Sequence, residues 1–249
     1  MISVCLATFN GEKFIKDQIH SILDQLDEND ELIISDDGST DRTLEIISSI
    51  KDRRIKIYYN NSRCYTKNFE NALNHANGDF IFLSDQDDIW MDNKVRITMQ
   101  YLEKYDFVMS NAKIVDENLR VITESRNNLL NVKNGFIKNF IKSYYLGCCM
   151  AFNKKVLDVS LPFPNNHSLC FHDSWISLIS ELYFKTYVCD ESLILYRRHT
   201  QNISHGGLKK EWAIINSIKI RCYLLFQLIK RVYMVKNKNG KMHKYKQKM

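Results

Sequence analysis

Strand and helix patterns alternate along the first third of the chain. Apolar runs predict strands at residues 2–7, 31–35, 55–59 and 79–83. The first three runs are followed by apolar residues at helical spacing, which predict helices at residues 14–26, 43–50 and 66–76. Alternating strands and helices with short connections are typical of a mostly parallel central sheet flanked by helices on both faces. The sequence therefore predicts an α/β fold.

Polar loops follow three of these strands, at residues 8–11, 36–41 and 85–88. Ligands of such sheets bind beyond the carboxyl ends of the strands, so we expect the three loops to form one site. The third loop holds three carboxylates, Asp85, Asp87 and Asp88, which would repel one another once buried. A hard divalent cation that also binds a phosphorylated substrate would balance this charge. A polar turn at the end of a strand is the alternative.

The second half of the chain has weaker periodicity. Apolar runs predict strands at residues 106–110, 146–152, 187–189 and 193–196, and helical spacing predicts helices at residues 136–145 and 173–183. The polar residues 118–134 predict a loop. Because no Pro-, Gly- or Ser-rich linker and no internal repeat divides the two halves, we expect one domain at residues 1–205 and a C-terminal segment at residues 206–249.

Charge and motifs exclude several classes of function. The net charge is +6, but residues 230–249 hold eight Lys or Arg and no Asp or Glu, so the rest of the chain sums to −2. A nearly neutral body argues against nucleic acid as the main partner. The sequence has neither the Gly-rich fingerprint of dinucleotide binding nor the Gly-Lys-Ser/Thr loop of NTPases. The sequence therefore fits a site that holds phosphates through a metal better than a site that holds them by backbone amides.

Cysteine usage and the N-terminus indicate a cytoplasmic protein. The seven cysteines are scattered and form no Cys-Xaa-Xaa-Cys pair, so we expect reduced thiols. Residues 1–7 contain no basic leader, and no apolar run approaches the ~20 residues of a membrane span. We therefore expect a protein that is neither secreted by a signal peptide nor integral to a membrane.

Four segments that carry polar and acidic residues follow one another in the chain: Ala7–Gly11, Ser35–Asp41, Gly78–Trp90 and His172–Trp175. Together they resemble the inverting nucleotide-sugar glycosyltransferases of family 2, which have the GT-A fold. The third segment, with its Ser-Asp-Gln-Asp-Asp-Ile-Trp form, and the run Gly147–Phe152 most resemble the bacterial rhamnosyltransferase-like branch. The resemblance spans about residues 1 to 205.

The resemblance implies roles for individual residues at the nucleotide. Asp37 matches the aspartate that accepts a hydrogen bond from the base of a pyrimidine nucleotide, although a turn residue before a glycine is the alternative. Thr8 and Asn10 match the loop that lines the nucleoside. Asp85 is expected to reach the ribose or a metal-bound water. Asp85 and Asp87 would point the same way in an extended segment, roughly 6 to 7 Å apart.

The resemblance also implies the metal site and the catalytic base. Asp87 is the expected ligand of a divalent cation, Mn or Mg. His199, which follows the last predicted strand, is expected to reach the diphosphate as a further metal-site residue; a solvated basic loop is the alternative. Asp173 matches the catalytic base that deprotonates the acceptor hydroxyl. A residue that only caps a helix is the alternative for Asp173.

The implied activity is metal-dependent, inverting transfer of a sugar from a nucleotide-diphosphate sugar, such as dTDP-rhamnose or a UDP-hexose. The expected acceptor is a hydroxyl of a growing cell-surface glycan on a carrier. A catalytically silent nucleotide-sugar-binding protein is an alternative. A nucleotidylyltransferase is another alternative, but it is disfavoured because the Gly-rich N-terminal loop with Arg or Lys is missing.

The C-terminal segment combines apolar and basic residues. Residues 212–235 have the composition of an amphipathic helix, and a Lys-rich tail follows it. Such a segment suits an anionic membrane surface and would bring the protein to a lipid-linked acceptor. We therefore expect peripheral association with the inner face of the cytoplasmic membrane. A helix packed on the catalytic domain, followed by a disordered terminus, is the alternative.

Overall fold

A computed structural model describes residues 1–199 and 214–246, with side chains of the C-terminal helix described at residues 217–235. A nine-stranded sheet forms its centre, in the order β3-β2-β1-β4-β8-β6-β9-β5, with β7 paired to β6. The bounds of the strands are β1 Ile2–Thr8, β2 Glu31–Asp36, β3 Ile55–Tyr59, β4 Phe80–Ser84, β5 Ile89–Trp90, β6 Phe107–Val115, β7 Val121–Thr123, β8 Met150–Asn153 and β9 Thr186–Arg197. The predicted α/β fold is confirmed.

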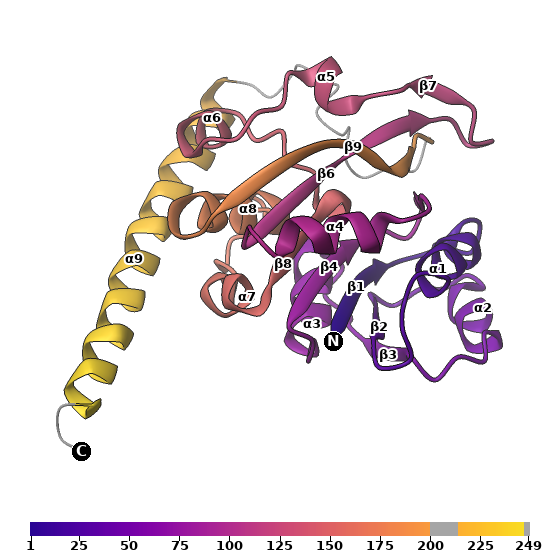
Figure 1. Ribbon diagram of the computed structural model, residues 1–249, viewed down its shortest axis with the longest axis horizontal. Coiled ribbons are helices and arrows are strands. Elements are labelled where there is room, and N and C mark those ends of the chain that lie inside the picture. Colours follow the sequence, from indigo (N-terminus) through magenta and orange to yellow (C-terminus); the bar gives the residue numbers. More distant parts are fainter. Residues whose placement is uncertain (200–213, 247–249) are drawn as a thin grey trace.

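Helices lie on both faces of this sheet (Figure 1). Their bounds are α1 Ile15–Leu23, α2 Thr43–Ser49, α3 Tyr65–Asn74, α4 Lys94–Leu102, α5 Arg126–Leu130, α6 Phe136–Ile141, α7 Lys154–Ser160 and α8 His172–Tyr183. α8 contacts both α3 and α7, and these pack on β1, β2 and β4. α4 packs on β6, β8 and β9 in front of the sheet. Apolar residues of β1, β2 and β4 that are fully shielded from solvent form the centre of the core.

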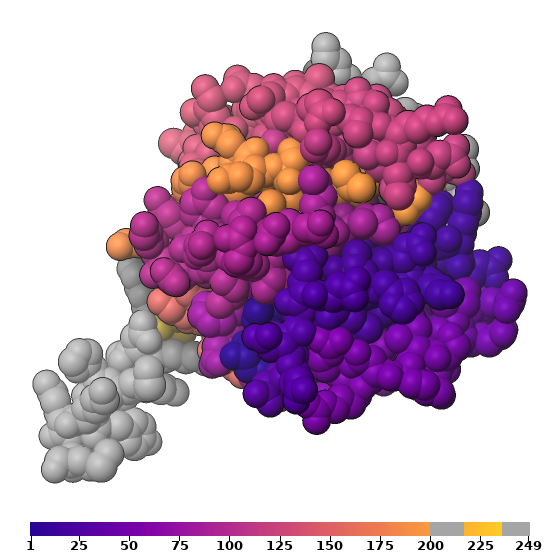
Figure 2. Space-filling view, turned by 45° about the vertical axis from the view of Figure 1, so that its right-hand side comes forward, coloured from indigo at the N-terminus to yellow at the C-terminus, as the bar shows by residue number. Residues whose placement is uncertain are grey.

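The parallel part of the sheet consists of β3, β2, β1 and β4. β1 pairs with both β2 and β4 in parallel register, and β2 pairs with β3 in the same way. Because successive parallel strands end at one edge, the loops after β1, β2 and β4 meet there. On the face seen in Figure 2, this N-terminal part fills the lower right and later residues fill the top.

The second half of the sheet differs from the mostly parallel arrangement. β8 is antiparallel to β4 and β6, β5 is antiparallel to β9, and only β6 with β9 is parallel. The two predicted strands at 187–189 and 193–196 form the single strand β9. The predicted loop at 118–134 contains β7 and α5, and the predicted strand at 146–152 begins with the 3-10 helix Gly147–Cys149. The sheet is therefore mixed.

The C-terminal helix α9 spans Ile214–Lys246 and packs on the domain along one face. Ile220, Leu224 and Leu228 are buried there, one helical turn apart. The Arg231 guanidinium donates to the carbonyl oxygens of Val159, Leu161 and Pro162 at the end of α7. In the described residues, no helix is both long and apolar enough to span a membrane. The predicted boundary between residues 205 and 206 lies outside the described residues, and so does Trp212, where the predicted amphipathic helix begins.

Candidate active site

The loops after β1 and β2 are joined directly by hydrogen bonds. The Asp37 backbone N–H donates to the Thr8 carbonyl oxygen at 3.0 Å. Asn10, which adopts a left-handed φ of 49°, accepts from the Thr40 backbone N–H with its side-chain oxygen at 2.8 Å. Gly38, at φ 78°, makes the turn in the second loop, a conformation that glycine adopts without strain. The structure thus brings Thr8, Asn10 and Asp37 together.

The Asp37 carboxylate holds the segment before α3. It accepts hydrogen bonds from the backbone N–H groups of Ser62 at 2.7 Å, Arg63 at 3.0 Å and Cys64 at 2.7 Å. Asp37 is buried, and a carboxylate has about four acceptor positions. The Ser62 hydroxyl donates to the same carboxylate at 3.3 Å, so these donors together fix the loop before α3 against Asp37.

Gln86 links the loop after β4, residues 85–88, to the loop after β1. We call residues 85–88 the acidic loop. Its Oε1 accepts from the Thr8 hydroxyl at 2.7 Å and from the Phe9 backbone N–H at 2.8 Å. Its Nε2 donates to the Phe9 carbonyl oxygen at 3.1 Å. The sequence interpretation missed this residue because it treated Gln86 only as the spacer between two aspartates. Its place between two charged positions was the available signal.

The acidic loop does not continue the strand. β4 ends at Ser84, and the backbone bends at Gln86 and Asp87, so the predicted extended geometry of Asp85 and Asp87 is wrong. The bend directs Asp87 to the end of β9, where its Oδ2 lies 2.7 Å from Nε2 of His199. The two residues predicted for the metal site are therefore adjacent in space.

Asp88 and Arg197 connect the same loop to β9. Asp88 is buried, and its Oδ1 accepts from the Arg197 backbone N–H at 3.0 Å. The Arg197 side chain donates through Nε to the Asp87 carbonyl oxygen at 2.9 Å and through a terminal nitrogen to the Glu117 carbonyl oxygen at 2.7 Å. Arg197 thus serves as a brace for the acidic loop, a role that the sequence did not indicate.

Asp173 is close enough to the acidic loop to influence its ionisation. Burial raises the pKa of Asp85 to about 8, and the carboxylates of Asp87 and Asp173 add to the rise. Burial and the Asp173 carboxylate likewise raise the pKa of the Tyr65 phenol. Burial, with Asp87 and Asp85, raises the pKa of Asp88 well above its usual range. The carboxylates of Asp87 and Asp173 therefore lie close enough to Asp85 to disfavour its ionisation.

Tight packing fixes the start of α8, where Asp173 lies. His172 is buried, and its ring stacks on Phe69 with 4.0 Å between ring centroids. A Cβ added to Gly147 would lie 2.7 Å from His172 Nε2 and 3.6 Å from the Asp173 Cβ. Asp173 itself is half-buried, with Oδ1 accepting from the Ser174 backbone N–H at 2.6 Å. Trp175 and Trp90 are buried in the core.

The donor groups around the acidic loop fit a hard divalent cation. Asp88 Oδ2 is buried and has no hydrogen-bond partner among the described residues. Ligand atoms of Asp85, Asp88 and Cys148 lie within 4.8 Å of one another. Carboxylate oxygens suit Mg and Mn, whereas a thiol is a soft ligand, and burial raises the pKa of the Cys148 thiol. The carboxylates, with His199 beside Asp87, are therefore the residues that could hold the metal.

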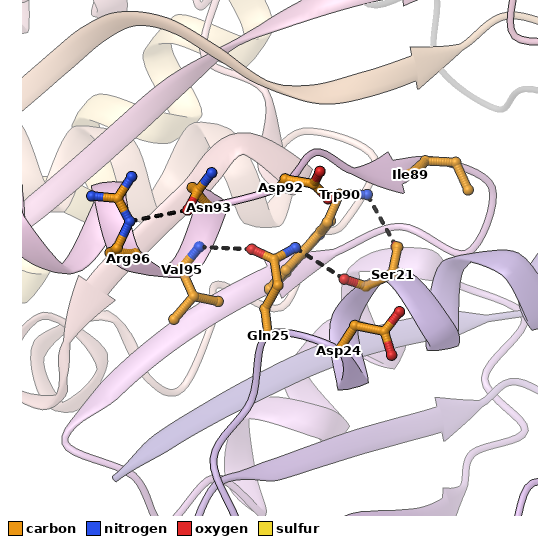
Figure 3. Close-up of a pocket in the computed structure, with 9 residues that line it drawn as sticks. All are labelled: Ser21, Asp24, Gln25, Ile89, Trp90, Asp92, Asn93, Val95 and Arg96. Carbon is orange, nitrogen blue, oxygen red and sulfur yellow. Dashed lines mark hydrogen bonds between the residues drawn. The ribbon is translucent and has the colours of Figure 1, made fainter.

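A hollow of about 560 Å³ lies elsewhere, between the end of α1, β5 and the start of α4 (Figure 3). Gln25 crosses it and accepts from the Val95 backbone N–H at 3.2 Å, while Ser21 accepts from the Trp90 backbone N–H at 3.1 Å. None of the carboxylates of the acidic loop lines this hollow. It is therefore separate from the candidate active site.

The fold and the acidic site define a GT-A glycosyltransferase. A family model described as "Glycosyl transferase family 2" matches residues 3–161, and the chain belongs to this family. It is similar to the Escherichia coli protein named "UDP-Glc:alpha-D-GlcNAc-diphosphoundecaprenol beta-1,3-glucosyltransferase WfgD", with 27% identity over 86% of this chain and 85% of the relative. It is also similar to the "dTDP-rhamnosyl transferase RfbG" of Shigella flexneri, with 29% identity over 79% of this chain and 72% of the relative.

Solved structures with the same fold support the architecture. The structure of S. aureus TarS residues 1–349 in complex with UDP-GlcNAc superposes with a TM-score of 0.66 and 21% sequence identity. The superposition covers 84% of this chain but only 61% of the TarS chain. At this level of identity the likeness establishes the GT-A fold, and the site residues are argued from their own geometry.

Proposed function

We propose that this chain transfers a sugar from a nucleotide-diphosphate sugar to a hydroxyl of a growing cell-surface glycan on a carrier, with inversion at the anomeric carbon. The observation that carries the proposal is the contact of Asp87 with His199 at the end of β9, 2.7 Å apart, in a chain that matches the family 2 model over residues 3–161. The names of the two relatives favour a UDP-hexose or dTDP-rhamnose as donor and a lipid-linked acceptor.

The loops after β1, β2 and β4 bind the donor in this proposal. Asp37 accepts a hydrogen bond from the pyrimidine base, Thr8 and Asn10 line the nucleoside, and Asp85 lies at the ribose. Gln86 fixes the loop after β4 against the loop after β1 through its hydrogen bonds to Thr8 and Phe9. Asp87, with His199 beside it, would hold the divalent cation, which supplies positive charge for the departing diphosphate.

Asp173 accepts the proton of the acceptor hydroxyl as that oxygen attacks the anomeric carbon. The position near the first turn of α8 suits an ionised carboxylate, because the helix dipole favours negative charge there. Attack from the side opposite the leaving diphosphate breaks the sugar–phosphate bond and inverts the anomeric configuration. His172, fixed against Phe69 and Gly147, positions the base.

The test is Asp173→Asn, which keeps the shape of the side chain but removes its basicity. Transfer should fall at least 100-fold, in line with general-base catalysis, while the dissociation constant of the nucleotide sugar changes by less than about threefold. Asp158→Asn, on the exposed face of α7, is the matched control and should have normal activity. Normal transfer by Asp173→Asn would overturn the assignment of the base.

A screen of nucleotide sugars for metal-dependent thermal stabilisation would identify the donor. Specific binding stabilises a protein in proportion to the logarithm of ligand excess, so one donor should raise the melting temperature more than the others. A nucleotide-sugar-binding protein without turnover would show the same stabilisation but no transfer. The anomeric configuration of the product, read by NMR, tests inversion directly.

A further inference from the structure

A second hollow, of about 250 Å³, lies beside α6. Its lining includes three lysines, Lys133, Lys138 and Lys142, all exposed to solvent. One water occupies about 30 Å³ in the liquid, so the hollow has room for a phosphate group with bound water. No Asp or Glu occurs between residues 125 and 157, which leaves the lysines without acidic neighbours in this stretch of sequence. In space, the Glu181 carboxylate accepts from the Tyr145 hydroxyl and the Gly135 backbone N–H, so the three lysines outnumber this acid and leave the hollow with net positive charge.

Asn139 gives this hollow a feature that a solvated lysine patch does not have. Its side chain also lines the hollow and is only 3% exposed. Both its amide nitrogen and its amide oxygen lack a hydrogen-bond partner among the described residues. A buried amide without a partner destabilises the folded state, and a ligand that bonds to it removes the penalty.

An exposed apolar surface borders the hollow. Ile137 and Ile141 of α6 are 71% and 68% exposed, and Ile141 also lines the hollow. The Arg221 side chain of α9 donates to the Ile141 carbonyl oxygen at 3.0 Å, so the two helices are adjacent. The outer face of α9 continues the surface with further exposed apolar residues, Ile218, Leu225, Phe226, Ile229 and Tyr233. We call these seven residues the apolar stripe.

We propose that the Lys133–Lys138–Lys142 hollow binds the phosphate headgroup of an anionic membrane lipid while the apolar stripe enters the bilayer. The combination of cationic hollow and apolar border matches such a lipid, because its phosphate is negative and its chains are apolar. Residues 212–249 add ten Lys or Arg and no acid, which favours an anionic surface over a second copy of this chain. This proposal deepens the proposed function, since it places the chain at its lipid-linked acceptor.

The hollow adjoins the chain segment that leads to the start of α8. Tyr144 and Tyr145 line it, and Gly147, which packs against His172, follows two residues later. Consecutive Cα atoms are about 3.8 Å apart, so Tyr145 and Gly147 are separated by at most about 7 Å. The Tyr145 hydroxyl donates to Glu181, about 12 Å along α8 from Asp173, so a lipid phosphate in the hollow would lie beside the helix that carries the base.

The experiment is cosedimentation of the full chain with vesicles, without donor or metal, so that its outcome does not depend on transfer. Vesicles of phosphatidylglycerol and phosphatidylcholine should bind the protein, and pure phosphatidylcholine should not. A triple variant, Lys133→Gln, Lys138→Gln and Lys142→Gln, should bind the anionic vesicles roughly 100-fold more weakly, at about fivefold per lysine. The matched control changes three exposed lysines that do not line the hollow, Lys16, Lys51 and Lys104, to Gln and should lose less than threefold.

Asn139→Leu separates a built headgroup site from a diffuse basic surface. It should raise the melting temperature, because an unpartnered buried amide is removed, and weaken vesicle binding several-fold without changing the charge. Equal vesicle binding by the two triple variants, or unchanged binding by Asn139→Leu, would overturn the proposal. A rise in melting temperature with inorganic diphosphate but no vesicle binding would also overturn the proposal. A dimer in solution that Phe226→Ser dissociates would overturn it as well.

Discussion

Substitution of Gly147 by Ala should disturb catalysis without touching any catalytic group. The new Cβ would lie 2.7 Å from His172 Nε2, whereas ordinary contact begins at 3.4 Å. His172 cannot swing away cheaply, because it is buried and stacked on Phe69. The strain must therefore move the start of α8, and with it Asp173.

Two magnitudes follow for this variant. Overpacking a close contact typically costs about 1–3 kcal/mol, which should lower the free energy of unfolding by that amount. A displacement on the scale of an ångström at a catalytic group can reduce the rate by about 100-fold. The turnover number for nucleoside diphosphate release should fall by up to that factor, whereas the dissociation constant of the donor should change little, since its loops lie on β1, β2 and β4.

The assays are urea denaturation, donor titration and release of nucleoside diphosphate under saturating substrates. A double-mutant cycle with His172→Ala supplies the control, because removal of the ring gives the new methyl group room. Gly147→Ala should then cost at least about 1 kcal/mol less in stability than it does in the native background. Wild-type turnover and stability in Gly147→Ala, or additive costs in the double variant, would refute the positioning role of His172.

Two further predictions concern the donor loops and the sheet. Gln86→Leu removes the hydrogen bonds to Thr8 and Phe9 and should weaken donor binding by about tenfold, measured by calorimetry. The free energy of unfolding should change little. Unaltered donor affinity would contradict the bridging role of Gln86. Burial raises the pKa of Glu31, but hydrogen bonds from Lys56, Ser3 and the Asn77 backbone outweigh it and hold that pKa below its usual value. The ionised form therefore stabilises the fold above the unfolded pKa of about 4.3, and this stabilisation is lost as pH falls through the folded pKa. Glu31→Gln should lower the free energy of unfolding by about 2 kcal/mol at pH 7. In urea denaturation at a series of pH values, the variant should lose less stability between neutral and acidic pH than the native protein does. The same loss in both proteins would contradict this assignment.

Local pattern was sufficient for the parallel half of the sheet. The strand predicted at residues 55–59 coincides with β3, and the loops after β1 and β2 meet because parallel neighbours end at the same edge. The sequence predicts two strands in place of β9 because the polar residues Asp190 and Glu191 resemble a turn. In the structure both are exposed on a continuous strand, and the Asn111 side chain donates to the Asp190 carbonyl oxygen where β6 has an irregular register. Such a pairing is not visible in a local pattern.

The residue types of the candidate site were predictable, but their partners were not. Asp87 and His199 are 112 positions apart and meet only because β9 returns beside β5. α4 was missed because polar and apolar residues mix on it, although Lys94, Val95 and Leu102 are buried. The exposure of Ile137 and Ile141 was equally hidden, since apolar residues in a helix ordinarily predict a buried face.

The antiparallel pairing of β4 with β8 divides the chain into two functional halves. Three Cα pairs, from Phe80 with Asn153 to Phe82 with Ala151, join them. The proposed nucleotide-binding residues all precede β8 in sequence order, whereas Asp173 and the residues that line the lysine hollow follow β6. Insertions between β6 and α8 would therefore change the proposed acceptor side while the donor loops and the end of β9, which contacts Asp87 and Asp88, stay intact, so new glycan linkages could arise with an unchanged nucleotide specificity.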